Sequence, residues 1–507
     1  MTDKVENGRP LKGFSLFATT CGVSIGTLLI ALDQYVANVS ISTISGELGV
    51  SVDDGTWTIT TYIVSNACSV PLTGWLTARL GRVRLFCFSA LLFTFFSFLC
   101  GFAFNFPMLI VFRAFQGLVS GGLIPLSQTL LLFLYPKEKG FAMGIWGLVV
   151  MVGPAAGPVL GGWITSNISW RWIFYINIPL GLLATALTWY FLARFESERK
   201  KLPLDIIGMT LMFITVGAFQ VMLDRGNDDD WWHSTFIVVL GILALVGFVF
   251  LIVWECFHPH PVIDLKLFKS RNFTLGSIAI GLGMSLVFVN MIVGPIWVQG
   301  PLGYTPLWAG YSIAAFGAAA IFLFPLVGAL LHRMDTRIWI GMGFICIIPA
   351  LFYLSYITID VPFIDLAWPR FLMGVGFAFF YVPLTTISLE GISLERLPSA
   401  TALFSFTRIL FLSVTTSLSI TYYARRENFF QERYVESIIP ARSQYQLYYD
   451  HLKDHLGLMG QKADAFVYQM IKNQAYTETF LELCYIAGCC FVVLFFMIFL
   501  FKKTKSV

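Results

Sequence analysis

The sequence predicts an all-α membrane protein with 14 transmembrane helices. Of its 507 residues, 57% are hydrophobic and only 12% are charged, whereas soluble globular domains average roughly 25% charged residues. The apolar residues gather in long runs separated by short polar loops, which is typical of helices that cross a bilayer. This pattern excludes a water-soluble enzyme, and the net charge of +4 is too small and too scattered to indicate nucleic-acid binding.

Each apolar run is close to the length of about 20 residues that a helix needs to cross a bilayer. The runs must be helical because lipid offers no partner to open backbone groups. They lie near 14–38, 53–77, 85–104, 107–133, 141–165, 171–194, 205–223, 234–257, 273–298, 307–331, 338–358, 367–389, 398–423 and 479–501.

The distribution of Lys and Arg over the short loops predicts the orientation. One set of loops and tails carries 21 basic residues, and the opposite short loops carry only Arg171 and Arg225. Basic loops stay in the cytoplasm, so the even number of spans places both termini there. The one long loop, 424–478, then lies outside, either as a solvated helical hairpin or as a docking surface for an extracytoplasmic partner.

The sequence also contains an internal repeat. The segment 74–84 is echoed by 328–337, where a Gly is again followed five residues later by Arg and then by another Arg, and Arg113 and Arg370 open spans 4 and 12. Such repeats indicate a secondary transporter with its binding site between two halves. The predicted organisation is an N-terminal tail 1–13, a six-helix bundle 14–194, a linker with two extra helices 195–260, a six-helix bundle 261–501 and a C-terminal tail 502–507.

Motifs along nearly the whole chain carry a family resemblance. They are Leu32-Asp33-x-x-x-Ala37-Asn38-Val39, Gly74 to Arg84, Arg113-x-x-Gln116-Gly117, Gly147-x5-Gly153-Pro154-x-x-Gly157-Pro158-x-x-Gly161-Gly162, Trp170-Arg171-Trp172-Ile173-Phe174-x-Ile176-Asn177-x-Pro179, Leu223 to Gly226, Leu267 to Phe273 and Pro383 to Ile387. By these motifs the chain resembles the major facilitator superfamily, in its 14-span drug:proton antiporter branch, and is similar to EmrB-like exporters. It departs from the family pattern at Ala78, where an Asp is usual.

The resemblance implies a proton-coupled exporter of hydrophobic or amphiphilic compounds, working by alternating access in the inner membrane. It also implies a periplasmic adaptor and an outer-membrane channel as partners, no cofactor beyond the proton gradient, and a conformational role for Arg79, Gly81 and Arg82 in the 74–84 loop. A major facilitator transporter of one metabolite, such as a siderophore, is the alternative. The spans lack the clustered His, Asp, Ser or Glu of an intramembrane enzyme, the polar stripe of a channel, and any spacing typical of a metal site.

The small residues of span 5 form a second candidate for conformational gating. Their spacing leaves one helix face without bulk, so another backbone can approach closely, and the prolines remove backbone hydrogen bonds. This face predicts a contact that opens and closes, with ordinary tight packing as the alternative. The residues are Gly153, Pro154, Gly157, Pro158 and Gly161.

Asp33 is the only acid well inside a predicted span, and such groups indicate function by default. At ~1.5 Å per residue, Asp33 and Arg113 both lie roughly 8–9 Å below the outer surface, so an ion pair between spans 1 and 4 is possible. We therefore predict that Asp33 carries the coupling proton, with Arg113 favouring the carboxylate in one state and releasing it in another. A static structural pair is the alternative.

Two further cations, Arg370 and Arg408, lie inside spans without an evident acid partner, and Arg408 lies close to the midplane. They are predicted either to bind backbone carbonyls or to give the cavity a positive character that suits weak acids. Pockets combine apolar walls with a few polar groups. The predicted cavity residues are Gln34, Asn38, Asn66, Gln128, Asn290, Trp297, Tyr381, Phe404, Phe406 and Arg408.

Overall fold

The computed structural model describes residues 11–501 except 201, 202, 204, 260, 438–442 and 457–459. Throughout this part the regular structure is helical, and thirteen helices are long and apolar enough to cross a membrane. The predicted tails 1–13 and 502–507 fall almost entirely outside the described residues.

The first group of helices, here called the N-terminal bundle, matches the predicted spans closely in its bounds. Its elements are α1 (Gly13–Val39), α4 (Trp57–Ser69), η1 (Val70–Leu72), α5 (Thr73–Leu80), α6 (Arg82–Phe102), α7 (Phe106–Ser120), α8 (Leu123–Leu134), α9 (Lys139–Asn167), α10 (Trp172–Tyr175), α11 (Asn177–Leu192) and η2 (Ala193–Phe195). Two short helices, α2 (Ile41–Leu48) and α3 (Val52–Gly55), form the loop after α1.

A pair of helices, α12 (Ile206–Arg225) and α13 (Thr235–Phe257), follows and is joined by η3 (Trp231–His233). The second group, here called the C-terminal bundle, comes after η4 (Leu265–Lys269). Its elements are α14 (Arg271–Gln299), α15 (Pro306–Leu330), η5 (Leu331–Arg333), α16 (Thr336–Leu354), α17 (Phe363–Leu389), α18 (Leu397–Ser437), α19 (Ser443–Leu456), α20 (Gln461–Phe496) and η6 (Met497–Leu500).

The predicted span 53–77 is not one continuous helix. Pro71 lies in the 3₁₀ turn η1, which separates α4 from α5. Proline cannot donate a backbone hydrogen bond and clashes with the preceding turn, so it interrupts the α-helix at this point. This is why thirteen rather than fourteen candidate spans are found in the described residues.

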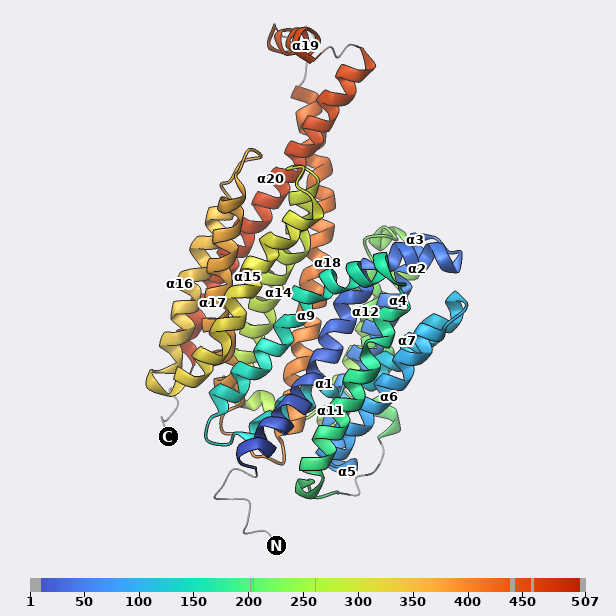
Figure 1. Ribbon diagram of the computed structural model, residues 1–507, viewed down its shortest axis with the longest axis vertical. Helices are drawn as coiled ribbons and strands as arrows, with labels where there is room; N and C mark the ends of the chain where they lie inside the picture. The colour runs from blue at the N-terminus through green and yellow to red at the C-terminus, as the bar shows by residue number, and fades with distance from the viewer. Residues whose placement is uncertain are drawn as a thin grey trace.

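The long loop 424–478 contains a helical hairpin, one of its two predicted forms, because both flanking helices continue into it. Helix α18 is 41 residues long and ends at Ser437, while α20 begins at Gln461. The two helices project beyond the rest of the molecule as a hairpin, with α19 at its tip (Figure 1). Hydropathy could not find these extensions because helices in water carry polar residues around much of their surface.

Glycines bring the two bundles together along a surface that we call the seam. A Cβ on Gly144 of α9 would stand 2.5 Å from the Phe324 carbonyl oxygen of α15, and one on Gly140 would stand 2.7 Å from the Gly328 carbonyl oxygen. Such distances leave room for glycine alone. The Thr129 and Thr401 hydroxyls, from α8 and α18, form a further hydrogen bond of 2.9 Å across the seam.

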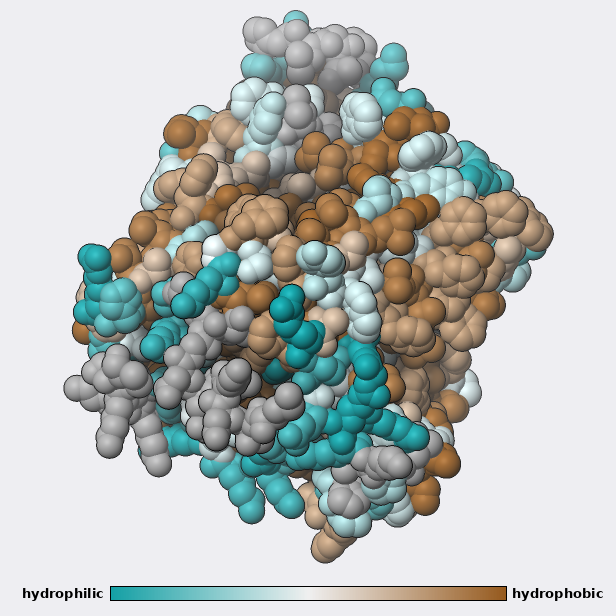
Figure 2. All heavy atoms as spheres, turned by 60° about the horizontal axis from the view of Figure 1, so that its bottom comes forward, coloured by the Kyte–Doolittle hydropathy of each residue, from teal (hydrophilic) through white to brown (hydrophobic). Residues whose placement is uncertain are grey.

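The first and last described segments lie at the same end of the molecule (Figure 1). Viewed more from that end, hydrophilic residues gather on its face, and hydrophobic residues cover much of the flanks (Figure 2). This division is expected of a protein whose flanks meet lipid while its ends meet water.

Candidate functional site: a buried carboxylate and a seam of aromatic residues

The side chain of Asp33 lies inside the N-terminal bundle and forms the predicted ion pair with Arg113. The distance from Arg113 NH1 to Asp33 Oδ2 is 2.7 Å, and each side chain is 1% exposed. The Arg113 Nε donates to the Thr58 carbonyl oxygen of α4 at 3.2 Å. The structure thus contains the predicted pair, while its role in proton coupling remains a prediction.

Two amides complete the shell around the Asp33 carboxylate. Gln116 donates to Oδ1 at 3.2 Å, and Asn177 donates to the same oxygen at 3.0 Å. Asn177 also donates to the Ser97 hydroxyl at 3.0 Å. The carboxylate therefore connects α1 directly to α7 and α11. It is also connected to α6, because Asn177 bonds the Ser97 hydroxyl, so the charged group holds four helices of the bundle together.

Aromatic rings and apolar side chains separate this network from water. The Arg113 guanidinium lies 4.4 Å from the Tyr62 ring centroid and 5.4 Å from that of Phe174. A compact apolar cluster that includes Leu109, Trp170 and Phe174 packs in the same bundle. In such a dry environment an ion pair must be fully hydrogen-bonded, because an unpaired charge costs several kcal/mol.

The loop after α1 is fixed to this apolar cluster by a polar contact. Glu47 of α2 accepts hydrogen bonds from the Trp170 indole and from Arg171, both at 2.8 Å. These two donors, the indole first, hold the pKa of Glu47 below its usual value. The Trp-Arg-Trp motif of the sequence therefore anchors the loop after α1 as well as the apolar cluster.

Gln116, Asn177 and Ser97 are site residues that sequence reasoning missed. Gln116 follows Arg113 by three residues, so the two side chains share one helix face, and this spacing could have identified it. Asn177 lies in a quoted motif without an assigned role. No sequence signal connects Ser97 to the acid.

The predicted cavity residues do not form one cluster. Asn66 donates to Ser120 at 2.7 Å within the N-terminal bundle, and Gln128 donates to the Met143 sulfur at 3.4 Å. Trp297 donates to Thr477 at 3.0 Å within the C-terminal bundle. The remaining dispersed residues are the half-buried Gln34, the exposed Asn38, and the buried Asn290 and Phe406.

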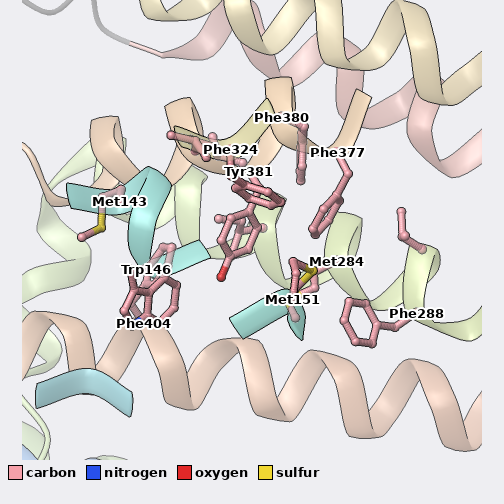
Figure 3. Close-up of a cluster of buried hydrophobic side chains, with 14 of the residues drawn as sticks. Met143, Trp146, Met151, Met284, Phe288, Phe324, Phe377, Phe380, Tyr381 and Phe404 are labelled. Carbon is pink, nitrogen blue, oxygen red and sulfur yellow. The ribbon is translucent and has the colours of Figure 1, made fainter. Parts of the chain in front are cut away.

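Tyr381 and Arg408 are the predicted cavity residues that do come together, and they do so at the seam. Arg408 NH1 donates to the Tyr381 hydroxyl at 2.7 Å. The Tyr381 ring stacks on Trp146 of α9, with centroids 6.3 Å apart and planes 7° apart. Phe404 belongs to the same buried cluster of side chains, together with methionines and phenylalanines (Figure 3).

The small face of span 5 packs inside the N-terminal bundle. Cβ atoms on Gly153 and Gly161 would stand 2.5 Å from the Ala31 carbonyl oxygen and 2.6 Å from that of Val36, both in α1, and one on Gly157 would meet the Tyr35 Cβ. Despite Pro154 and Pro158, α9 is continuous. This contact is thus not between the bundles, and a gating role for these residues remains a prediction.

The 74–84 loop is held by an acid that sequence analysis did not single out. Glu196 accepts from the backbone N–H groups of Val83 at 3.0 Å and of Arg84 at 2.8 Å, which satisfies free donors at the start of α6. Gly81 has φ +95°, and a Cβ there would stand 2.4 Å from the Glu196 carboxyl carbon. Gly81 is therefore required by its backbone conformation and by this close approach.

The predicted arginines of the loop have separate contacts. Arg82 NH2 donates to the Phe195 carbonyl oxygen at 3.0 Å, and its guanidinium lies 3.6 Å from the Phe133 ring centroid. Arg79 lies 5.2 Å from the Trp75 ring centroid. Ala78 accepts a backbone hydrogen bond from Lys200 at 2.8 Å.

Within the described residues, no group of three or more His, Cys, Asp or Glu is placed to hold a metal ion. The candidate site consists of a buried, hydrogen-bonded carboxylate in the N-terminal bundle and a group of aromatic and apolar side chains at the seam. Comparisons with known proteins place these features in a family.

The chain is similar over nearly its whole length to curated transporters. It is 39% identical over 502 residues to the multidrug export protein EmrB of Escherichia coli K12, with 98% of each chain covered. It is 41% identical over 432 residues to the fatty acid resistance protein FarB of Neisseria gonorrhoeae, with 85% of each covered. The fold resembles that of the proton:xylose symporter XylE, with a TM-score of 0.60, 14% identity and 97% of each chain covered.

The model of the Major Facilitator Superfamily matches residues 23–414. This range contains the Asp33 network, the pair α12 and α13, and the seam residues Trp146, Tyr381 and Arg408. The chain therefore belongs to the Major Facilitator Superfamily, and multidrug export proteins are among its relatives.

Proposed function

We propose that the protein is a proton-coupled exporter of hydrophobic and amphiphilic compounds that works by alternating access. The relatives named for multidrug export and fatty acid resistance, at 39% and 41% identity, support the class of cargo. The observation that carries the proposal is the Asp33 carboxylate, which is buried and bound to Arg113, Gln116 and Asn177. A titratable group that fastens several helices couples its protonation state to their packing.

In the proposed cycle, a proton on Asp33 removes the charge that the Arg113 guanidinium faces. The ion pair between α1 and α7 then weakens, because only a neutral hydrogen bond is left in place of a charge-assisted one. Return of the carboxylate restores the pair. Asp33 is thus the proposed proton carrier, and Arg113 is the cation that pairs with its charged form and loses that ion pair when Asp33 is protonated.

Helix α9 is the proposed mechanical link between the carboxylate and the seam. Its Gly153 and Gly161 contact the backbone of α1, which carries Asp33. Its Gly140 and Gly144 contact α15 of the other bundle. Because both contacts are backbone to backbone, a shift of α1 passes to the seam with little side-chain slack.

The proposal includes a topology. Segments α4, η1 and α5 together form a fourteenth span, and α12 and α13 are a pair inserted between two six-helix bundles. Both termini lie in the cytoplasm, as the 21 basic residues of the predicted inner loops indicate. The membrane is the inner membrane, which places the α18–α20 hairpin on the periplasmic side.

We further propose that the protein is the inner-membrane part of a tripartite pump. The projecting hairpin carries exposed apolar side chains on a segment outside the bilayer, such as Val435, Phe466 and Tyr468. Exposed apolar residues at such a place favour contact with another protein. The partners are a periplasmic adaptor and, through it, an outer-membrane channel.

The test uses the purified chain in proteoliposomes with an imposed pH gradient and a lipophilic dye as cargo. Replacing Asp33 with Asn keeps the size of the side chain and removes its proton site, so we expect gradient-driven dye flux to be abolished. Dye exchange without a gradient should persist, which also reports that the variant is folded. The matched control is Glu255→Gln, which changes another buried acid, in α13, whose carboxylate accepts a hydrogen bond from the Ile263 backbone N–H at 3.0 Å.

Gradient-driven flux at the wild-type rate in the Asp33→Asn variant would refute Asp33 as the proton carrier. Loss of flux in both Asp33→Asn and Glu255→Gln would show that replacing any buried acid impairs the protein. The result would then give no support to Asp33 as the specific proton carrier. Absence of gradient-driven flux in the wild-type protein would refute the proposed function itself.

A further inference from the structure

Arg408 places a positive charge at the seam. Its side chain lies on α18 and is 5% exposed. It donates to the Tyr381 hydroxyl of α17 at 2.7 Å, and its guanidinium lies 5.4 Å from the Trp146 ring centroid. Since Trp146 belongs to α9, this cation contacts a residue of the N-terminal bundle as well as one of its own.

The charge of Arg408 is not neutralised by a protein carboxylate. Arg113 has Asp33 at 2.7 Å, but Arg408 forms no ion pair with any acid of the described residues. A phenol and an aromatic face attract a guanidinium only weakly in comparison with a carboxylate. A buried cation in this situation is costly unless an anion joins it.

The surroundings of Arg408 are apolar and deformable. The Tyr381 ring lies 5.8 Å from that of Phe324 and 5.2 Å from that of Phe377. Met143 and Met151 of α9 and Met284 of α14 lie around this group, together with Phe288 and Phe404 (Figure 3). Methionine side chains adapt to differently shaped apolar partners, so this wall suits varied hydrocarbon or aromatic cargo.

The Trp146–Tyr381 stack is the contact that would open. One ring is on α9 and the other on α17, so a separation of the bundles at this level parts the two rings and exposes the Arg408 guanidinium that contacts both residues. The site is then a single positive charge set in an apolar wall. Its complement is an amphiphile with one negative head group.

We propose that Arg408 and Tyr381 bind the carboxylate of amphiphilic weak acids, while the Met and Phe residues of the seam hold the apolar part. This rests on the proposed export function and names the class of cargo at the seam. The Arg408 guanidinium pairs with the carboxylate, and the Tyr381 hydroxyl donates to it. Lipophilic cations are disfavoured at this position by the same charge.

The test compares three ligands of equal chain length with the purified full-length protein: dodecanoate, its methyl ester and dodecyltrimethylammonium. Binding is measured by quenching of tryptophan fluorescence. Dodecanoate should bind at least tenfold more tightly than the ester, and Arg408→Met should abolish this difference while ester binding is retained. Arg370→Met, the same change at a buried arginine inside the C-terminal bundle, is the matched control and should leave the difference intact.

Two results would overturn the inference: equal wild-type affinity for acid and ester, or an undiminished preference for the acid in Arg408→Met. If Arg408→Met does not fold, the subtler Tyr381→Phe decides, because loss of the hydroxyl alone should reduce the preference several-fold, and an unchanged preference refutes the site. The binding assay needs no pH gradient, so it is independent of the proton-coupling test. Asp33→Asn should still prefer dodecanoate, and Arg408→Met should still carry a neutral dye under a gradient.

Discussion

The two bundles bury an arginine at corresponding positions in their fourth helices, but only one of these arginines has an acid. In the N-terminal bundle, Arg113 faces Asp33 at 2.7 Å. In the C-terminal bundle, Arg370 of α17 donates to the Leu366 carbonyl oxygen at 3.3 Å, while its NH2 group has no hydrogen-bond partner within the described residues. Both side chains are 1% exposed.

The neighbours of Arg370 are a neutral counterpart of the Asp33 network. Its NH2 lies 3.0 Å from the point where a Cβ on Gly294 would stand, and the Asn290 Oδ1 lies 3.9 Å from the same point. The Asn290 amide in turn donates to the Cys484 sulfur of α20 at 3.2 Å. Asn290 on α14 therefore lies near Arg370 without forming a hydrogen bond to it, and a carboxamide cannot gain or lose a proton near neutral pH.

The two bundles therefore repeat a buried arginine at the same place in the fold, but they do not repeat the acid that pairs with it. The C-terminal bundle keeps the buried cation without a carboxylate beside it, so the proposed proton site belongs to one half of the molecule alone. The two arginines then have opposite energetic roles. Arg113 neutralises a buried carboxylate, whereas Arg370 is itself the uncompensated charge.

The largest difference in stability is expected when Arg113 and Arg370 are each replaced by Met. Arg113→Met leaves the Asp33 carboxylate buried and unpaired, so we expect a loss of about 3–5 kcal/mol in the free energy of unfolding at neutral pH. Arg370→Met removes an unpaired cation and keeps an apolar stem, so it should be neutral or stabilising. Denaturant unfolding of the two purified variants in matched detergent measures both values, and equal destabilisation would contradict the proposed asymmetry.

A smaller effect is expected from the amides that surround the two arginines. Asn177→Ala removes one hydrogen bond to a charged oxygen, which contributes about 1.5–3 kcal/mol. We therefore expect gradient-driven flux to fall by roughly tenfold or more, at 1.4 kcal/mol per factor of ten, with dye exchange retained. Asn290→Ala, the matched change in the C-terminal bundle, should leave the flux within about twofold of wild type, because no proton-carrying group depends on it.

If Asn290→Ala instead reduces gradient-driven flux as much as Asn177→Ala does, the C-terminal cluster takes part in coupling. The assignment of proton handling to one bundle would then be wrong. Measuring exchange flux in the same vesicles separates a coupling defect from a loss of folded protein.

The comparison also explains which parts of the site could be predicted from sequence. The ion pair was predictable because Asp33 is the lone acid inside a span and helix rise fixes depth. Depth along the helix does not fix which way a side chain points around the helix axis. Asn66 and Trp297 were therefore predicted to line a cavity from their depth alone, whereas their hydrogen bonds are made within their own bundles. Asn177 was missed because contacts between distant helices leave no periodic signal in one sequence.

The bounds of the hairpin helices and the position of the seam were not predicted, for different physical reasons. The extensions of α18 and α20 lie beyond the apolar runs, where hydropathy has no basis for finding helix. The seam was hidden because Gly140 and Gly144 resemble any other small residues of span 5, and only the structure separates their face from that of Gly153. Predictions from apolar pattern are thus reliable for spans and weak for contacts between them.

The smallest predicted effect concerns the loop after α1, where Trp170 and Arg171 bind Glu47. Because the pKa of Glu47 is lowered in the folded state, its contribution to stability is present above the ordinary carboxyl pKa and is lost as the pH falls through the lowered value. Glu47 and Arg171 are 47% and 34% exposed, so screening by solvent limits this contribution to a few tenths of a kcal/mol. Glu47→Gln should thus lower the free energy of unfolding slightly at pH 7, and the difference from wild type should shrink as the pH falls through the lowered pKa, as measured by denaturant unfolding. If Glu47→Gln lowers the free energy of unfolding more than Asn177→Ala does, the loop after α1 contributes more to the stability of the bundle than the Asn177 bond to the buried carboxylate.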